Sequence, residues 1–134
     1  MVVLMRAFTL VCLTAVVVAG VSAGGRFRAQ DAARETTVID VVAERFSFTP
    51  SEIRTTVGTT LEIRLESDDT AHGFHIVGTD VNVELPKRSR GTVTVTFTPE
   101  EAGRYTFECS KMCGAGHAFM RGVIVVDEPP VEGR

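Results

Sequence analysis

The sequence predicts an all-β domain built as a sandwich or a barrel. Residues 60–66 alternate apolar Leu, Ile and Leu with Glu, Arg and Glu, and residues 91–98 alternate Val, Val and Phe with threonines. A period of two marks a strand with one buried face. Glycines, prolines and a polar cluster also cut the chain into short runs, and this spacing is typical of sandwiches and barrels.

The breaks between the expected strands are turn-forming residues. They are Pro50, Gly58, the Ser67-Asp68-Asp69 cluster, Gly78, Pro86 and Gly103. Between them we expect strands near 38–44, 52–57, 60–66, 73–77, 80–85, 91–98, 104–109 and 121–126.

The N-terminal segment has the features of an export signal. Arg6 supplies a positive charge, residues 7–25 are uncharged and rich in Leu, Val and Ala, and Val21-Ser22-Ala23 offers the small residues that a signal peptidase prefers. The run is also long enough to span a membrane, which takes about 20 apolar residues. We therefore expect residues 1–23 to be a signal peptide or a membrane anchor, and the domain to lie outside the cytoplasm.

The rest of the chain is expected to hold one domain. Residues 24–37 are polar and are expected to be a linker, residues 38–127 form the domain, and residues 128–134 form a tail. With 134 residues, 44% of them hydrophobic, the chain has no room for a second core. A net charge of -3 argues against a nucleic-acid partner and is compatible with a basic protein partner.

One segment concentrates metal-binding side chains. From Cys109 to Met120 the chain reads C-x-x-x-C-x-x-x-H-x-x-M, with the histidine at His117. Thiolate, imidazole and thioether ligands together favour copper over hard cations, and a thioether argues against zinc. Gly114 and Gly116 allow the tight turns that a loop around a metal needs.

The second cysteine suggests two metal ions rather than one. A mononuclear electron-transfer copper site uses one Cys, two His and a weak Met, so Cys113, His117, Met120 and one distant histidine would complete it. Cys109 is then surplus. It has a role if both sulfurs bridge two metals, each of which keeps its own histidine.

The distant histidine must be His72 or His75. Alternation along a strand puts His72 on the same face as Phe74 and puts His75 on the other face, so a regular strand cannot aim both at one site. His72 adjoins the flexible 67–71 loop and is the better ligand. His75 is expected to be a partly exposed strand residue.

Two other interpretations of the cysteines stay open at this stage. A disulfide between Cys109 and Cys113 would suit an oxidising compartment but leaves the His and Met spacing unexplained. A structural zinc site of two Cys and two His would leave Met120 as a core residue.

These residues resemble the CuA domain of subunit II of haem-copper cytochrome oxidases, a Greek-key β-sandwich of the cupredoxin family. The likeness covers about residues 38–127. The segments 69–75 and 78–84 follow the small, single-anchor subunit II of thermophilic-type oxidases. By this resemblance Cys109 and Cys113 bridge both coppers, His72 and Met120 complete one, and His117 with the backbone carbonyl of Lys111 completes the other.

The resemblance implies electron transfer with no catalysis on this chain alone. The domain would accept electrons from a cytochrome c or a small copper protein and pass them to the catalytic subunit of a haem-copper oxidase. Its place would be the periplasm or the outer face of the cytoplasmic membrane. The alternative is a free-standing periplasmic copper carrier or metallochaperone with the same ligands.

Overall fold

The computed structural model describes residues 35–130, so the predicted signal peptide or anchor at 1–23 lies outside the described residues. The described strands are β1 (Thr36–Glu44), β2 (Ser47–Thr49), β3 (Glu52–Thr56), β4 (Thr60–Ser67), β5 (His72–Ile76), β6 (Asn82–Leu85), β7 (Val93–Phe97), β8 (Gly103–Glu108) and β9 (Arg121–Asp127). A short 3₁₀ helix, η1 (His117–Phe119), precedes β9. Within residues 35–130 no helix has the length and hydropathy needed to cross a membrane.

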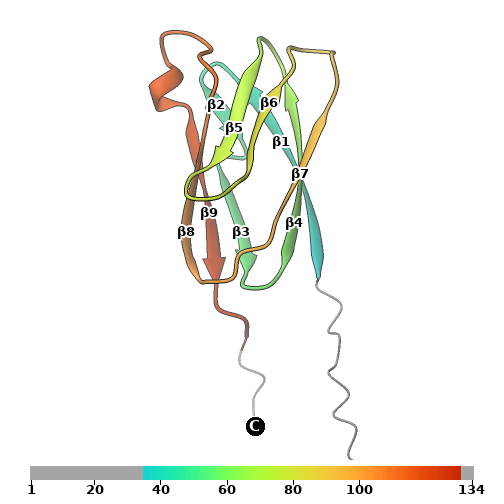
Figure 1. Ribbon diagram of the computed structural model, residues 1–134, viewed down its shortest axis with the longest axis vertical. Helices are drawn as coiled ribbons and strands as arrows, with labels where there is room; N and C mark the ends of the chain where they lie inside the picture. Colours follow the sequence, from blue (N-terminus) through green and yellow to red (C-terminus); the bar gives the residue numbers. More distant parts are fainter. Residues whose placement is uncertain (1–34, 131–134) are drawn as a thin grey trace, which may run out of the picture. The chain divides into compact units, whose positions relative to one another are not determined.

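The strands form two sheets that face each other (Figure 1). One sheet has the order β2-β1-β4-β7, and the other has the order β3-β9-β8-β5-β6. β1 pairs with β4, and β3 with β9, in parallel, while the remaining pairs are antiparallel. The predicted all-β sandwich is confirmed.

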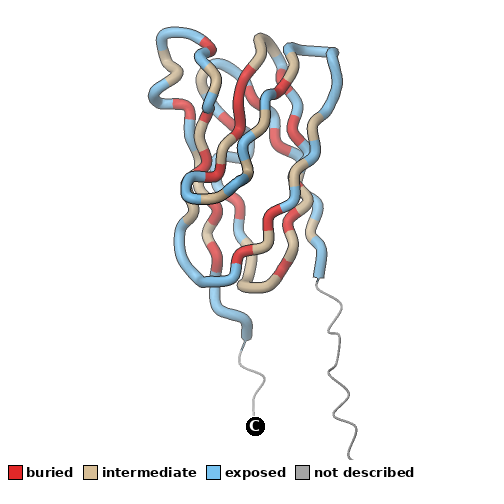
Figure 2. The backbone as a smooth tube through the Cα atoms, viewed as in Figure 1, coloured by how far each residue is buried: buried red, intermediate tan, exposed pale blue. Residues whose placement is uncertain are grey.

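The alternation in the sequence corresponds to the two faces of the strands. In β4 the side chains of Leu61, Ile63 and Leu65 are fully buried, while the residues between them face outward. Figure 2 shows the buried positions alternating with exposed ones along the strands. Burying one such side chain stabilises a fold by about 1.5–3 kcal/mol, so the register of each strand is strongly specified.

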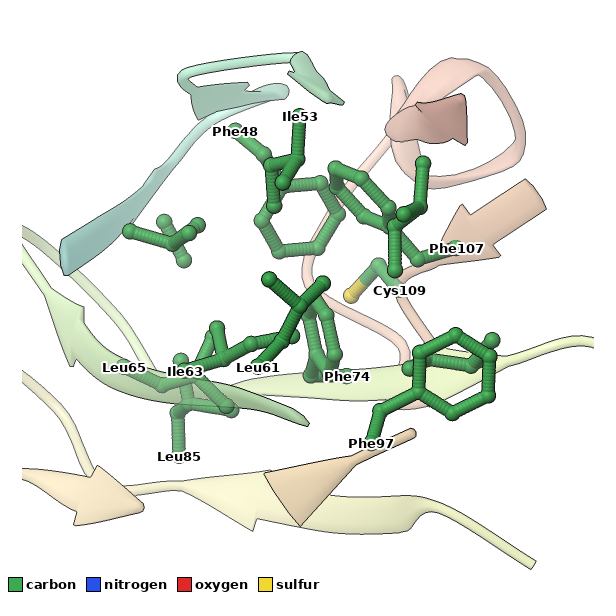
Figure 3. Close-up of a cluster of buried hydrophobic side chains, with 14 of the residues drawn as sticks. Phe48, Ile53, Leu61, Ile63, Leu65, Phe74, Leu85, Phe97, Phe107 and Cys109 are labelled. Atoms are coloured by element: carbon green, nitrogen blue, oxygen red, sulfur yellow. The ribbon is translucent and has the colours of Figure 1, made fainter. Parts of the chain in front are cut away.

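An aromatic cluster fills the core between the sheets. Phe48, Phe74 and Phe107 are buried, and their ring centroids lie 5.1–5.7 Å apart. Such spacing is within the favourable range for aromatic pairs. Figure 3 shows the sulfur of Cys109 directed into this cluster. The core therefore extends up to the predicted metal-binding loop.

The structure differs from the sequence prediction mainly at the ends of strands and at β2. β1 begins at Thr36 and β5 at His72, two residues and one residue earlier than expected. β2 is a strand that the sequence does not predict. It has only three residues and buries Phe48 alone, so it is too short to show a periodic pattern.

Candidate metal centre

The predicted metal-binding loop joins two neighbouring strands. Cys109 directly follows β8 and Met120 directly precedes β9, and these strands pair with each other. The backbone N–H of Cys109 donates to the carbonyl of Met120 at 3.0 Å, which closes the base of the loop. The loop lies at the end of the sandwich opposite the start of β1 and the end of β9 (Figure 1).

Two glycines let this loop adopt its path. Gly114 has φ +138°, a conformation that L side chains rarely adopt. A Cβ at Gly116 would meet the ring of Phe46 at 2.2 Å. The ring of Phe46 therefore packs against Gly114 and Gly116, and a side chain at either of these two positions would not fit.

The two cysteine sulfurs lie at the centre of the loop. Both side chains are buried free thiols, and their Sγ atoms are 3.7 Å apart. A disulfide has a sulfur–sulfur distance of about 2.05 Å. The thiols are therefore adjacent but not bonded, as two sulfurs that share a metal would be.

Each sulfur faces one imidazole. His72 Nδ1 is 3.8 Å from Cys109 Sγ, and His117 Nδ1 is 3.8 Å from Cys113 Sγ. His72 is fully buried, because it begins β5 next to β8 in the same sheet. His117 is half-buried in η1. The structure thus brings one histidine from each of two distant segments to the thiols.

The remaining predicted donors lie beside the same sulfurs. Met120 Sδ is 3.8 Å from Cys113 Sγ, and its side chain is buried. The Cys109 thiol donates to the backbone carbonyl of Lys111 at 3.1 Å. His75 lies elsewhere, with its Nδ1 4.0 Å from Glu108 Oε1 on the outer face of the sheet. The predicted donor set is therefore gathered in one place, and His75 is not part of it.

The distances between the donors are compatible with a bound metal and exclude a covalent bond between the two sulfurs. In a tetrahedral site with bonds of about 2.3 Å to sulfur, neighbouring donor atoms lie about 3.8 Å apart. The separations of 3.7 Å between the two cysteine sulfurs and 3.8 Å between Cys113 Sγ and Met120 Sδ agree with this value. The thioether of Met120 adds a soft donor that a structural zinc site would not use.

Asp69 orients one of the imidazoles, a role that the sequence motifs do not predict. Its Oδ1 lies 2.7 Å from Nε2 of His72. Because a carboxylate only accepts hydrogen bonds, Nε2 carries the hydrogen and the Nδ1 lone pair is left for a metal. Metal-binding histidines commonly have such a carboxylate partner. The signal available in the sequence was an aspartate three residues before the histidine.

Burial affects the pKa of Cys113, which is one of the donors, and of Asp69, which faces the donor His72. Burial, reinforced by the neighbouring Cys109 thiol, raises the pKa of Cys113 to about 11, so this thiol is protonated at neutral pH in the absence of a metal. Burial alone would raise the pKa of Asp69. Its hydrogen bonds with His72 and with the backbone N–H groups of Thr70 and Arg45 outweigh burial, and the net effect lowers the pKa.

The first half of the loop is fastened to β6. Lys111 Nζ donates to Glu84 Oε2 at 2.8 Å, and Ser110 Oγ donates to Asn82 Oδ1 at 2.8 Å. The backbone also lies close to β5, because a Cβ at Gly73 would be 2.7 Å from the nitrogen of Lys111. These contacts place the Lys111 carbonyl beside the thiols.

This chain is similar in sequence to a family of cupredoxin-like domains and to two curated proteins. The profile of the cupredoxin-like domain family matches residues 10–126. Cytochrome c oxidase subunit 2 of Thermus thermophilus is 39% identical over 88 residues, which cover 66% of this chain and 64% of that protein. A second such protein, from a particular strain of the same species, is also 39% identical, and the alignment covers 51% of it. The alignments thus span between 51% and 64% of these relatives.

Solved structures show the same fold. The structure of a heme-copper terminal oxidase dimer contains a chain with a TM-score of 0.61 and 29% identity, covering 73% of this chain and 68% of that chain. The periplasmic domain of subunit II of cytochrome oxidase from Bradyrhizobium japonicum also has a TM-score of 0.61, covering 68% of this chain and 83% of that chain. At 18% identity, this second likeness shows the fold alone.

Proposed function

The chain belongs to the family of cupredoxin-like domains, and on this premise we propose that it is a copper-binding electron-transfer domain of the oxidase subunit II type. The observation that carries the proposal is the pair of adjacent free thiols, 3.7 Å apart, with one imidazole facing each. One thiol would suffice for a single copper. The arrangement therefore supports a binuclear CuA centre with two copper ions per chain.

Each donor has one role in this proposal. Cys109 and Cys113 would hold both ions. His72 and Met120 would complete the ligands of one ion, and His117 and the Lys111 backbone carbonyl would complete those of the other. Copper held by thiolates and imidazoles supplies reversible one-electron chemistry.

The chain's own residues keep the donors in place during that chemistry. Three of the donors, His72, Cys109 and Met120, lie at or next to the ends of paired strands. These three and Cys113 are all buried. Burial excludes water from the sulfurs, and the strand pairing prevents the donors from moving apart. A change of redox state then needs little rearrangement of the protein, which is what rapid electron transfer requires.

The exposed side of the loop offers a docking surface for an electron donor. Met112 and Phe119 are 76% and 79% exposed, unusually high values for large apolar side chains, and both lie on the same loop as His117. Figure 2 shows that much of this loop is exposed. Large apolar side chains that are this exposed favour a role in contacting a partner protein. We assign it to a cytochrome c or a small copper protein, with a haem-copper oxidase catalytic subunit as the acceptor.

The proposal includes a location outside the cytoplasm, in the periplasm or on the outer face of the cytoplasmic membrane. Support comes from the relatives, which are oxidase subunits 2, and from the apolar N-terminal sequence. A free-standing periplasmic copper carrier could use the same donors, but it is less supported because the two curated sequences that align with this chain are cytochrome c oxidase subunits 2.

Copper loading of the full chain tests the proposal. We expect two copper ions per chain and a purple colour. We also expect a mixed-valence EPR signal whose hyperfine structure arises from two equivalent copper nuclei. Metal analysis together with optical and EPR spectra measures all three. One copper per chain with a blue, single-nucleus spectrum would contradict the binuclear centre.

The Met120→Leu variant tests whether Met120 tunes the reduction potential of the centre without being needed to hold copper. A thioether is a weak donor that tunes the potential of copper–thiolate sites, so its loss should leave both coppers bound and raise the reduction potential. Leucine conserves the buried volume of this side chain, and such swaps usually cost less than about 1.5 kcal/mol. Copper analysis and voltammetry measure the outcome.

Met112→Leu is the matched control, because Met112 is 76% exposed and its sulfur is outside the donor set. Its potential should equal that of the wild type. An unshifted potential in fully loaded Met120→Leu would mean that Met120 is a core residue only.

A further inference from the structure

Arg45 contacts both the metal-binding loop and Asp69, the carboxylate that faces His72. It lies in the turn between β1 and β2. Its side-chain Nε donates to the backbone carbonyl of Cys113 at 3.1 Å, across 68 residues of sequence. Its backbone N–H donates to Asp69 Oδ2 at 3.1 Å. Apart from His72, which is itself one of the donors, no other described residue hydrogen-bonds to both the metal-binding loop and Asp69.

These contacts connect the two imidazole-bearing segments. Asp69 accepts from Arg45 with Oδ2 and faces Nε2 of His72 with Oδ1. A continuous chain of contacts therefore runs from the Cys113 carbonyl through Arg45 and Asp69 to His72. The next residue, Phe46, covers Gly114 and Gly116 on the same side of the loop. The turn thus holds the second half of the loop, as β6 holds the first half.

The contacts of Arg45 suit positioning better than stabilisation of the fold. The side chain is 51% exposed, and its Nε is 3.8 Å from Asp69 Oδ2. An exposed ion pair of this kind contributes little to folding. Its positive charge still lies close to the donors, because its Nε is 3.1 Å from the carbonyl oxygen of Cys113. A positive charge there favours the electron-rich state of the site.

We propose that Arg45 is a positioning residue of the copper centre, which fixes the Cys113 segment relative to His72 and raises the reduction potential through its charge. The inference rests on the proposed function for its effect on potential. The positioning role itself concerns only residues of this chain and can be measured without metal.

Two variants of the full chain test the effect of the Arg45 charge. Arg45→Gln removes the charge, and Arg45→Lys keeps it; both keep the backbone hydrogen bond to Asp69. Arg64→Gln is the matched control, because Arg64 is 49% exposed and pairs with Glu62 on β4, away from the loop. In the copper-loaded chain, voltammetry should show a lower potential for Arg45→Gln, and values near wild type for Arg45→Lys and Arg64→Gln.

Amide hydrogen exchange provides the readout without metal. Losing the bond to the Cys113 carbonyl should speed exchange in residues 109–117 of Arg45→Gln by about fivefold, the factor that corresponds to one ordinary hydrogen bond. Arg64→Gln should exchange there like the wild type. Circular dichroism melting should give the same transition for all variants, which shows that the fold is kept.

The outcomes separate this inference from the proposed function. If Arg45→Gln matches Arg64→Gln in both potential and loop exchange, Arg45 has no positioning role. If the wild-type chain binds no copper, the proposed function fails, and with it the effect on potential. The exchange comparison then decides the positioning role alone: faster exchange in Arg45→Gln supports it, and equal rates overturn it.

Discussion

Cys109→Ser is expected to abolish the mixed-valence copper signal and to leave at most one copper per chain. The Cys109 sulfur lies 3.7 Å from Cys113 Sγ and 3.8 Å from His72 Nδ1. It also receives the backbone N–H of Gly73 at 3.5 Å. A serine hydroxyl is a far poorer copper ligand than a thiolate, so one of the two bridges is lost. Metal analysis and EPR spectra of the loaded variant measure the change.

Ser110→Ala is the neighbouring control. Its hydroxyl bonds to Asn82 and lies outside the donor set, and the contact of Lys111 with Glu84 still fastens this half of the loop to β6. This variant should therefore keep two coppers and the wild-type spectrum. Circular dichroism shows whether Cys109→Ser remains folded, since a hydroxyl would then occupy a buried position. A folded Cys109→Ser chain with an unchanged EPR spectrum would rule out the thiolate bridge.

The fold and most of the donor set could be predicted because their signals are local. The alternation in β4 depends only on which face of the sheet is buried, and the structure buries the residues that the pattern indicated. All the donors except His72 fall in the segment from Cys109 to Met120, so their proximity follows from the sequence. His72 needed one additional step, the alternation of side chains along a strand.

The supporting residues could not be predicted because their contacts are long-range. Arg45 reaches Asp69 across 24 residues and Cys113 across 68 residues, through a turn that precedes the short strand β2. Nothing near Arg45 in the sequence resembles a metal-binding motif. Lys111 was singled out for its carbonyl, yet its side chain also fastens the loop to Glu84. Such roles depend on tertiary structure alone.

The composition of the loop explains why it needs this support. Its cysteines, histidine and buried methionine face one another, and its glycines have no side chains to contribute to a core. Phe46, Glu84 and Arg45 supply contacts from outside the loop instead. Two segments outside the loop, the Arg45-Phe46 turn and β6, therefore hold the site in shape, which reduces the ordering required when copper binds.

His72→Ala is expected to cause the second large effect, a loss of copper from the centre. His72 is fully buried, and its Nδ1 faces Cys109 while Asp69 holds the other ring nitrogen. Losing a residue that hydrogen-bonds to a metal ligand, as Asp69 does to His72, typically lowers metal affinity about 10- to 100-fold. Losing the ligand itself should lower it more. Copper titration and the EPR spectrum of the full chain measure the loss.

His75→Ala is the matched control, since it removes the same side chain three residues later on the same strand. His75 faces Glu108 on the outer side of the sheet, and its side chain is 27% exposed. The variant should keep the copper count and spectrum of the wild type. The contrast tests the strand register directly, because a shift of one residue would exchange the two faces. Loss of copper in His75→Ala, with retention in His72→Ala, would place the centre on the opposite face of β5.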